Sequence, residues 1–156
     1  MAELKILNAR ESRELLQSIE EQWGAKIKMD CGFLKNNKNR VFIVSKDISR
    51  IETSRLRLNS VGMYFCETDR HGIRLSIEGA QIVGQESSKN TVEVDEDLAR
   101  KWLTGDDLEL QCKDCSGFVI LKLKKPHSKD FDYLGCGKYR DGKVLNYVGK
   151  SRRIYQ

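Results

Sequence analysis

Hydrophobic residues near the start of the chain recur at the spacing of an amphipathic helix. Asn8 precedes this stretch and Glu11 follows three residues later, which is the pattern of a capping box with Asn in the place of Ser or Thr. Gly24 tolerates the left-handed conformation in which helices commonly end. We therefore predict a helix over residues 9–23. Its apolar face carries Leu15, Leu16, Ile19 and Trp23.

Shorter apolar runs follow, and their β-branched and aromatic residues favour strands. Polar turns separate them, with an Asn-rich turn at residues 36–39 and a hairpin loop at residues 69–72. Ser45 is expected to cap a short helix that carries Ile48 and Ile51. The strands predicted in this half of the chain cover residues 25–29, 32–34, 40–44, 61–66 and 73–77.

Residues 85–90 are polar and without periodicity, so we interpret them as a linker between two units, residues 1–85 and 91–156. Asp95 in the second unit is expected to cap an amphipathic helix that ends near Gly105. The apolar face of this helix carries Leu98, Ala99, Trp102 and Leu103. Strands are predicted at residues 91–94, 108–111 and 117–123. The predicted fold class is α+β, with a small α/β domain first.

The glycine-rich stretch near the C-terminus predicts an antiparallel hairpin. Asp141-Gly142 is a strong signal for a two-residue turn, because a type I′ turn requires positive φ angles that Asp and Gly tolerate. Its strands are expected at about residues 134–140 and 143–148. From Lys138 onward six basic residues stand against one Asp, a net charge of +5 that equals the formal net charge of the chain. Basic residues beside tyrosines favour contact with the phosphates of a nucleic acid whose bases stack on the rings. An equally good interpretation is a solvated basic tail that only aids solubility.

Composition and length indicate a globular protein. The chain has 156 residues, of which 33% are charged and 39% hydrophobic. No run of about 18 apolar residues is present, so no membrane span is expected. The N-terminus lacks the apolar segment of a secretory signal peptide. We therefore expect a cytoplasmic protein without a membrane partner.

The cysteines number five, and an odd count in a cytoplasmic chain argues against a disulfide framework. Cys112-x-x-Cys115 has the spacing of half a zinc site or of a redox motif. Zinc needs four ligands, however, and a redox pair usually opens a helix. The interpretation that we favour is a tight polar turn with two free thiols.

The sequence contains no recognisable catalytic set. His71 and His127 are isolated from other acid–base residues, and His71 is expected at an exposed loop tip. No dinucleotide-binding glycine motif lies between a strand and a helix, and no Walker A sequence occurs. The acidic residues 95–97 are explained by the N-terminal dipole of the helix that they begin. We therefore predict no catalytic residues, no cofactor and no metal.

The second unit resembles the PUA domain, a small β-barrel that binds structured or single-stranded RNA. The resemblance rests on residues 92–105, on the Leu-Gly-Cys-Gly-Lys strand ending at Lys138 and on residues 146–150. The unit is most similar to the PUA-like tail of Sun-family RNA cytosine-5 methyltransferases, where Gly-x-Gly-Lys leads to Lys-Asn-x-x-Pro-Lys. Asn146 and Lys150 match that pattern, whereas Leu and Gly stand where Lys and Pro are usual. The resemblance implies a PUA-like β-barrel for this unit.

The first unit is similar to the α/β domain that precedes PUA in small ribosome-assembly factors of archaea and eukaryotes. After the capped helix, the resemblance covers residues 30–34, 40–44, 61–65 and 74–79. Nothing in the sequence resembles the catalytic domain of Sun-family enzymes, which holds S-adenosylmethionine. The resemblance therefore implies a non-catalytic RNA-binding protein that acts in ribosome biogenesis or in rRNA or tRNA modification.

The resemblance also implies which residues contact RNA, since a PUA domain binds RNA across its first helix and a neighbouring strand. Tyr139 and Tyr147 offer rings that either stack on a base or fill the barrel; we assign packing to one of them and leave open which. The residues expected to bind RNA are Arg100, Lys101, Lys138, Lys143, Asn146, Lys150, Arg152 and Arg153.

Two further hypotheses compete with RNA binding as the main role. In the first, the chain is an adaptor whose first unit docks a methyltransferase or a ribosome-assembly protein, or it serves a methyltransferase in trans as an RNA-binding subunit. A contiguous exposed apolar patch on the first unit would mark this role. In the second, the chain is a small RNA-modifying enzyme, which the missing acid–base and cofactor elements disfavour.

Overall fold

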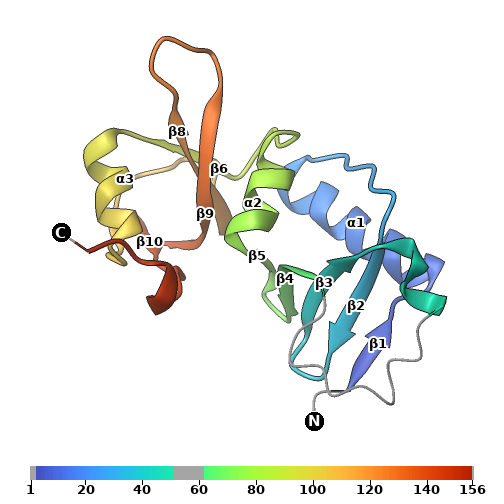
Figure 1. Cartoon of the computed structure of the whole chain (residues 1–156). Helices are drawn as coiled ribbons and strands as arrows, with labels where there is room; N and C mark the ends of the chain where they lie inside the picture. Colours follow the sequence, from blue (N-terminus) through green and yellow to red (C-terminus); the bar gives the residue numbers. More distant parts are fainter. Residues whose placement is uncertain (1–2, 51–61, 156) are drawn as a thin grey trace.

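The computed structural model describes residues 3–50 and 62–155, which form two five-stranded sheets with three α-helices (Figure 1). The first half of the chain contains β1 (Leu4–Ile6), α1 (Ala9–Trp23), β2 (Gly32–Asn36), β3 (Arg40–Val44), the 3₁₀ turn η1 (Lys46–Arg50), β4 (Met63–Asp69), β5 (Gly72–Leu75) and α2 (Ile77–Gly84). The second half contains β6 (Thr91–Val94), α3 (Glu96–Leu103), β7 (Leu108–Glu109), β8 (Gly117–Lys124), β9 (Phe131–Arg140), β10 (Lys143–Leu145) and the 3₁₀ turn η3 (Lys150–Arg152).

Helix α1 forms as its sequence pattern predicts. The Asn8 side chain accepts a hydrogen bond from the backbone N–H of Glu11 at 2.8 Å, and the Glu11 carboxylate accepts one from the Asn8 N–H. Gly24 ends the helix at φ 67°. Ile19 and Trp23 are fully buried against the first sheet, so the apolar face of the helix is a core face.

The first sheet is antiparallel throughout, in the order β1-β2-β3-β4-β5. Its strands alternate between two faces. Phe33 and Val41 join the large core under α1, whereas Leu34 and Phe42 form a smaller cluster on the other face. The predicted loop between β4 and β5 is confirmed, with Gly72 at φ 122°.

Several predictions for the first half are wrong in detail. Residues 25–29 form no strand, and β1 was not predicted. The strand expected at residues 73–77 ends at Leu75, and Ser76 then caps α2 by accepting a hydrogen bond from Gly79 N–H. The short helix expected after Ser45 is the 3₁₀ turn η1. Ile51, assigned to that helix, and Val61, assigned to the next strand, lie outside the described residues.

The second sheet has the order β6-β8-β9-β10-β7, with β6 parallel to β8 and the other neighbours antiparallel. The predicted strands at residues 91–94 and 117–123 are confirmed, and β7 is shorter than expected. Between described residues, the pairings leave this sheet open. The closed barrel that the resemblance implies therefore stays a prediction.

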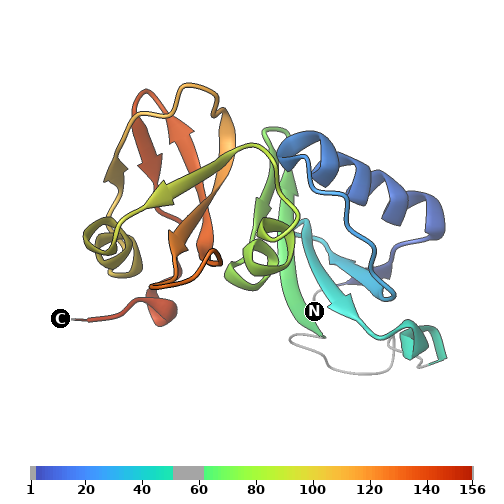
Figure 2. The ribbon, with the colours of Figure 1, turned by 90° about the horizontal axis from the view of Figure 1, so that it is seen from above.

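Both faces of the second sheet are buried, and α2 from the first half covers one of them. Along β8, Val119 and Leu121 point into the core of the second half, whereas Phe118 and Ile120 join the core of the first half. Figure 1 shows α2 between the two sheets, and Figure 2 shows the same arrangement from above. Residues on both sides of the proposed boundary after residue 85 therefore share a core, and the division into two domains stays a prediction.

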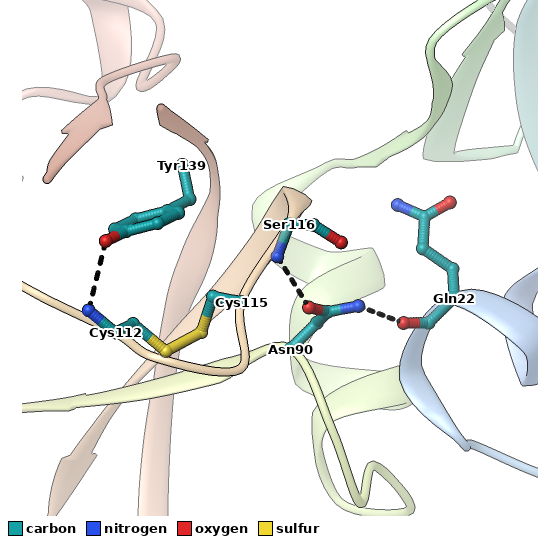
Figure 3. The surroundings of a disulfide bond; sticks show 6 residues. All are labelled: Gln22, Asn90, Cys112, Cys115, Ser116 and Tyr139. Carbon is teal, nitrogen blue, oxygen red and sulfur yellow. Dashed lines mark hydrogen bonds between the residues drawn. A yellow bond between two sulfur atoms is a disulfide. The ribbon is translucent and has the colours of Figure 1, made fainter. Parts of the chain in front are cut away.

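Asn90 holds the connection between the two units in a fixed conformation (Figure 3). Its side-chain amide donates to the Gln22 carbonyl at 2.5 Å and accepts from the Ser116 N–H at 3.1 Å. The residue has φ 53°, in the left-handed region that Asn tolerates better than most residues. The predicted linker is therefore an ordered connection.

We expect Asn90→Ala to lower the free energy of unfolding by about 2 kcal/mol, because the variant loses both hydrogen bonds and strains the left-handed backbone. Asn90→Gly is the matched control, since glycine accepts the positive φ but lacks the amide, and it should lose about 1 kcal/mol. Urea unfolding of both variants measures the difference. Equal losses would show that backbone conformation is unimportant here.

Of the helices that the structure describes, none has the length and apolar character needed to cross a membrane.

Candidate nucleic-acid interface

The β9–β10 hairpin turns as the sequence predicts. Asp141 and Gly142 have φ angles of 50° and 77°, the two positive values that a type I′ turn requires. Strand β9 begins earlier than expected, and β10 ends at Leu145. The chain then leaves the sheet and runs beside α3 to the C-terminus.

Glycines of β9 allow α3 to pack directly on the hairpin. A Cβ on Gly137 would lie 2.5 Å from Val144 Cγ1 and 2.6 Å from Trp102 Cη2. Trp102 is fully buried, and its indole N–H donates to the Leu134 carbonyl at 3.4 Å. Gly135 has φ 136°, a conformation that other residues rarely adopt. The Gly-x-Gly motif of this chain is thus explained by packing.

Helix α3 presents two of the predicted RNA-binding residues to solvent. Asp95 caps the helix by accepting a hydrogen bond from Leu98 N–H at 2.8 Å, as predicted. Because Ala99 and Trp102 are buried on the inner side, Arg100 and Lys101 in the last turn are exposed.

Asn146 has a structural role that its sequence motif did not reveal. Its side-chain amide donates to the carbonyls of Trp102 and Asp106, both at 2.8 Å, and accepts from the Val148 N–H at 2.7 Å. These bonds fasten the segment after β10 to the C-terminal end of α3. Both amide protons are engaged, so any contact of Asn146 with RNA would have to compete with these bonds.

The C-terminal segment, residues 146–155 after β10, lies beside the same end of α3. The Ile154 N–H donates to the Leu103 carbonyl at 2.9 Å. The Arg153 guanidinium donates to the Val148 carbonyl at 3.1 Å and lies over Gly105, where a Cβ would be 2.5 Å from Arg153 Nε. The segment and α3 lie side by side in Figures 1 and 2.

The structure therefore brings most of the predicted residues together and separates others. We define the α3 face as Arg100 and Lys101 of the last turn of α3, Asn146 and Arg153, which contact that end of the helix, and Lys150, whose carbonyl accepts a hydrogen bond from the Arg153 N–H. Lys143 lies at the hairpin tip, opposite Glu109 on β7. Lys138 lies opposite Phe118, with its ammonium 5.8 Å from the centroid of that ring. Arg152 turns toward the first half of the chain and pairs with Glu78 on α2 at 2.8 Å.

The α3 face keeps free cationic groups. Among the described residues, no salt bridge involves Arg100, Lys101 or Lys150, all three of which are exposed. Unpaired guanidinium and ammonium groups keep all their side-chain donors available for phosphate oxygens. The arrangement can therefore bind a polyanion without breaking internal ion pairs.

The two tyrosines that the sequence left undecided have different environments. The Tyr139 hydroxyl accepts a hydrogen bond from the Cys112 N–H at 3.1 Å, and its ring packs against the core of the second half. The Tyr147 side chain is 41% exposed. Tyr139 is thus the packing residue, and Tyr147 is the one available for stacking.

Cys112 and Cys115 form a disulfide, so the predictions of two free thiols and of no disulfide are wrong (Figure 3). The bond closes the turn between β7 and β8. The adjoining Tyr139 hydroxyl and Asn90 amide hold the backbone on either side of this turn. An odd number of cysteines is compatible with one local disulfide, because the three other cysteines remain free. The count therefore did not exclude this pair.

Two of the free thiols are unsuited to chemistry at neutral pH. Burial raises the pKa of Cys66 and of Cys136 to about 12, because desolvation disfavours the thiolate. Both side chains are enclosed in the large core. Within the described ranges, no group of three or more metal-ligating residues is found.

Comparisons with known proteins show what the chain resembles. Residues 89–154 match the family model described as the methyltransferase RsmF PUA domain. Over 140 residues, or 90% of the chain, the sequence is 26% identical to ribosomal RNA small subunit methyltransferase F of Aeromonas salmonicida and 28% identical to that of Aeromonas hydrophila. The chain spans 27% of the length of these relatives.

A solved structure supports the fold. The chain superposes on a PUA domain from Aeropyrum pernix K1 with a TM-score of 0.50 and 12% identity, over 88% of this chain and 72% of that one. The identity with the methyltransferases extends into the first half, beyond residues 89–154. Residues 89–154 therefore resemble a PUA domain in sequence and in fold, and the chain as a whole resembles part of ribosomal RNA small subunit methyltransferase F.

Proposed function

We propose that this chain is a non-catalytic RNA-binding protein that contacts RNA through the α3 face. The observation that carries the proposal is the match of residues 89–154 to a PUA domain, in which Arg100 and Lys101 of the last turn of α3 are exposed and have no salt bridge to any residue that the structure describes. The planar guanidinium of Arg can donate two parallel hydrogen bonds to a phosphate, whereas the ammonium of Lys acts as a point charge. Lys138, Lys143 and Arg152 extend the proposed RNA contacts beyond this face.

The relatives favour ribosomal RNA as the target. They are methyltransferases of small-subunit rRNA, and the chain matches a part of them that includes a PUA domain. We infer that this protein acts in the cytoplasm in rRNA modification and ribosome biogenesis, with a methyltransferase as a partner. Modification of tRNA is the second target class that a PUA domain would suit.

The adaptor hypothesis has less support from the surface of the first half. Its large exposed hydrophobic residues among those described are Ile6, 40% exposed, and Met63, 38% exposed. These residues lie on β1 and β4, which two other strands separate. Two isolated apolar side chains are ordinary on a protein surface.

Salt dependence tests the proposed RNA binding. If four cations of the α3 face each neutralise one phosphate, log K should fall with log salt with a slope of about −3. Between about 0.05 and 0.2 M salt, this slope weakens binding about fiftyfold. Fluorescence anisotropy with single-stranded RNA of random sequence and about ten nucleotides measures the slope. A flat response, or no binding at low salt, would contradict the proposal.

A further inference from the structure

A second polar site lies between the two halves of the chain, away from the α3 face. A cleft of about 420 Å³ is enclosed by Tyr64 and Arg74 from the first sheet and by the segment from Tyr147 to Arg152 that follows β10. This volume falls within the range of small-ligand sites. Because opposite walls come from different halves, the cleft exists only while the two halves remain packed together.

An exposed aromatic ring forms one wall and is held in place by its neighbours. The Arg74 guanidinium carbon lies 4.5 Å from the centroid of the Tyr147 ring, and Phe118 meets that ring edge-on with a centroid distance of 6.0 Å. Tyr147 nevertheless keeps 41% of its surface exposed. A ring fixed by packing and open to solvent can stack on a base at little cost in side-chain entropy.

Three guanidinium groups line the same cleft. Glu67 pairs with both Arg40, at 3.6 Å, and Arg74, at 2.9 Å. Arg152 comes from the C-terminal segment and pairs with Glu78 at 2.8 Å. Three cations are thus held by two carboxylates, which leaves an excess of one positive charge. Each guanidinium carries five N–H donors, so these ion pairs orient the groups and leave donors for a further acceptor.

We propose that this cleft binds one nucleotide of a single-stranded RNA segment, with the base on Tyr147 and the phosphate near Arg40 and Arg152. This inference rests on the proposed RNA binding and adds a second contact, made by both halves of the chain. An RNA that reaches from the α3 face to this cleft would also contact Arg152, which does not belong to the α3 face. The first half thereby becomes part of the recognition surface.

The test measures binding of labelled single-stranded RNA of about ten nucleotides by anisotropy, with the full chain. Tyr147→Leu keeps an apolar side chain against Phe118 but removes the aromatic face, and it should weaken binding about tenfold. Tyr147→Phe keeps the ring and should bind as the wild type does. Tyr155→Leu is the matched control, because Tyr155 is 86% exposed and does not line the cleft.

Ultraviolet crosslinking with mass spectrometry adds a direct readout, with an RNA adduct expected on Tyr147. If RNA binds but Tyr147→Leu has unchanged affinity and no adduct forms in the cleft, this inference is wrong and the proposed function stands. If no RNA binds at all, the proposed function fails first. Competition with free adenosine and uridine monophosphates separates the two sources of a nucleotide. If the protein binds a mononucleotide saturably but does not bind RNA, the proposal that the cleft binds a nucleotide of RNA is wrong.

Discussion

Replacing Gly137 with alanine is expected to lower the free energy of unfolding by about 3 kcal/mol, because the new methyl group has no room. Its Cβ would lie 2.5 Å from Val144 Cγ1, 2.6 Å from Trp102 Cη2 and 2.7 Å from the Leu145 carbonyl oxygen. Val144 and Trp102 are fully buried, and the carbonyl belongs to the backbone, so none of the three can move away at low cost. Differential scanning calorimetry should show a melting temperature lower by about 6–12 °C.

Gly149→Ala is the matched control for this variant. Gly149 is exposed at φ −59° and ψ 144°, a conformation open to alanine, and nothing lies within 4 Å of the position that a Cβ would take there. Its free energy of unfolding should change by less than about 1 kcal/mol, with a small gain from reduced freedom of the unfolded chain. If Gly137→Ala were as stable as Gly149→Ala, the close packing of α3 on the hairpin would be disproved.

Neutralising the α3 face is expected to remove most of the salt-dependent RNA binding. In the triple variant Arg100→Gln, Lys101→Gln, Lys150→Gln, the slope of log K against log salt should become less steep by about 2, since each lost phosphate contact contributes about 0.7. At about 0.05 M salt the affinity should fall at least tenfold, to a similar extent for all RNA sequences. Anisotropy titrations at several salt concentrations give both quantities. Gln suits a helix, so α3 should stay folded.

A second triple variant carries the same change of charge elsewhere. Lys26, Lys28 and Lys38 are exposed and belong to the first half of the chain, in the coil after α1 and in the β2–β3 turn. Their replacement by Gln should leave the slope within about 0.7 of the wild-type value. Equal losses in the two triple variants would mean that net charge alone drives binding and that the α3 face is no specific site.

Local interactions explain why several elements could be predicted from the sequence. Helix α1 has its capping box, its apolar face and its terminal glycine within a span of residues 8–24, and each contributes without help from the rest of the fold. The hairpin turn at Asp141 and Gly142 depends on two φ angles that these residue types favour. The cap of α3 at Asp95 is equally local.

Two elements that depend on contacts with distant segments, α2 and β1, were not predicted. Helix α2 contains two glycines and three β-branched residues, which give it a weak intrinsic preference for a helix. Its helical state is stabilised because Ala80 and Val83 are fully buried in a core that also contains β8 and β9 residues. Strand β1 is three residues long and is stabilised by its antiparallel pairing with β2. Such contacts join distant parts of the chain, so no local pattern reports them.

The sequence by itself determined which residues carry the positive charge and, through its resemblance to PUA domains, the kind of ligand that they suit. The tertiary structure decided how those residues are used. It places Arg100 and Lys101 on the exposed side of the last turn of α3, engages both amide protons of Asn146 and pairs Arg152 with Glu78 across the two halves. The physical reason is that the charge of a side chain is fixed by its chemistry, whereas its partners depend on contacts between distant segments.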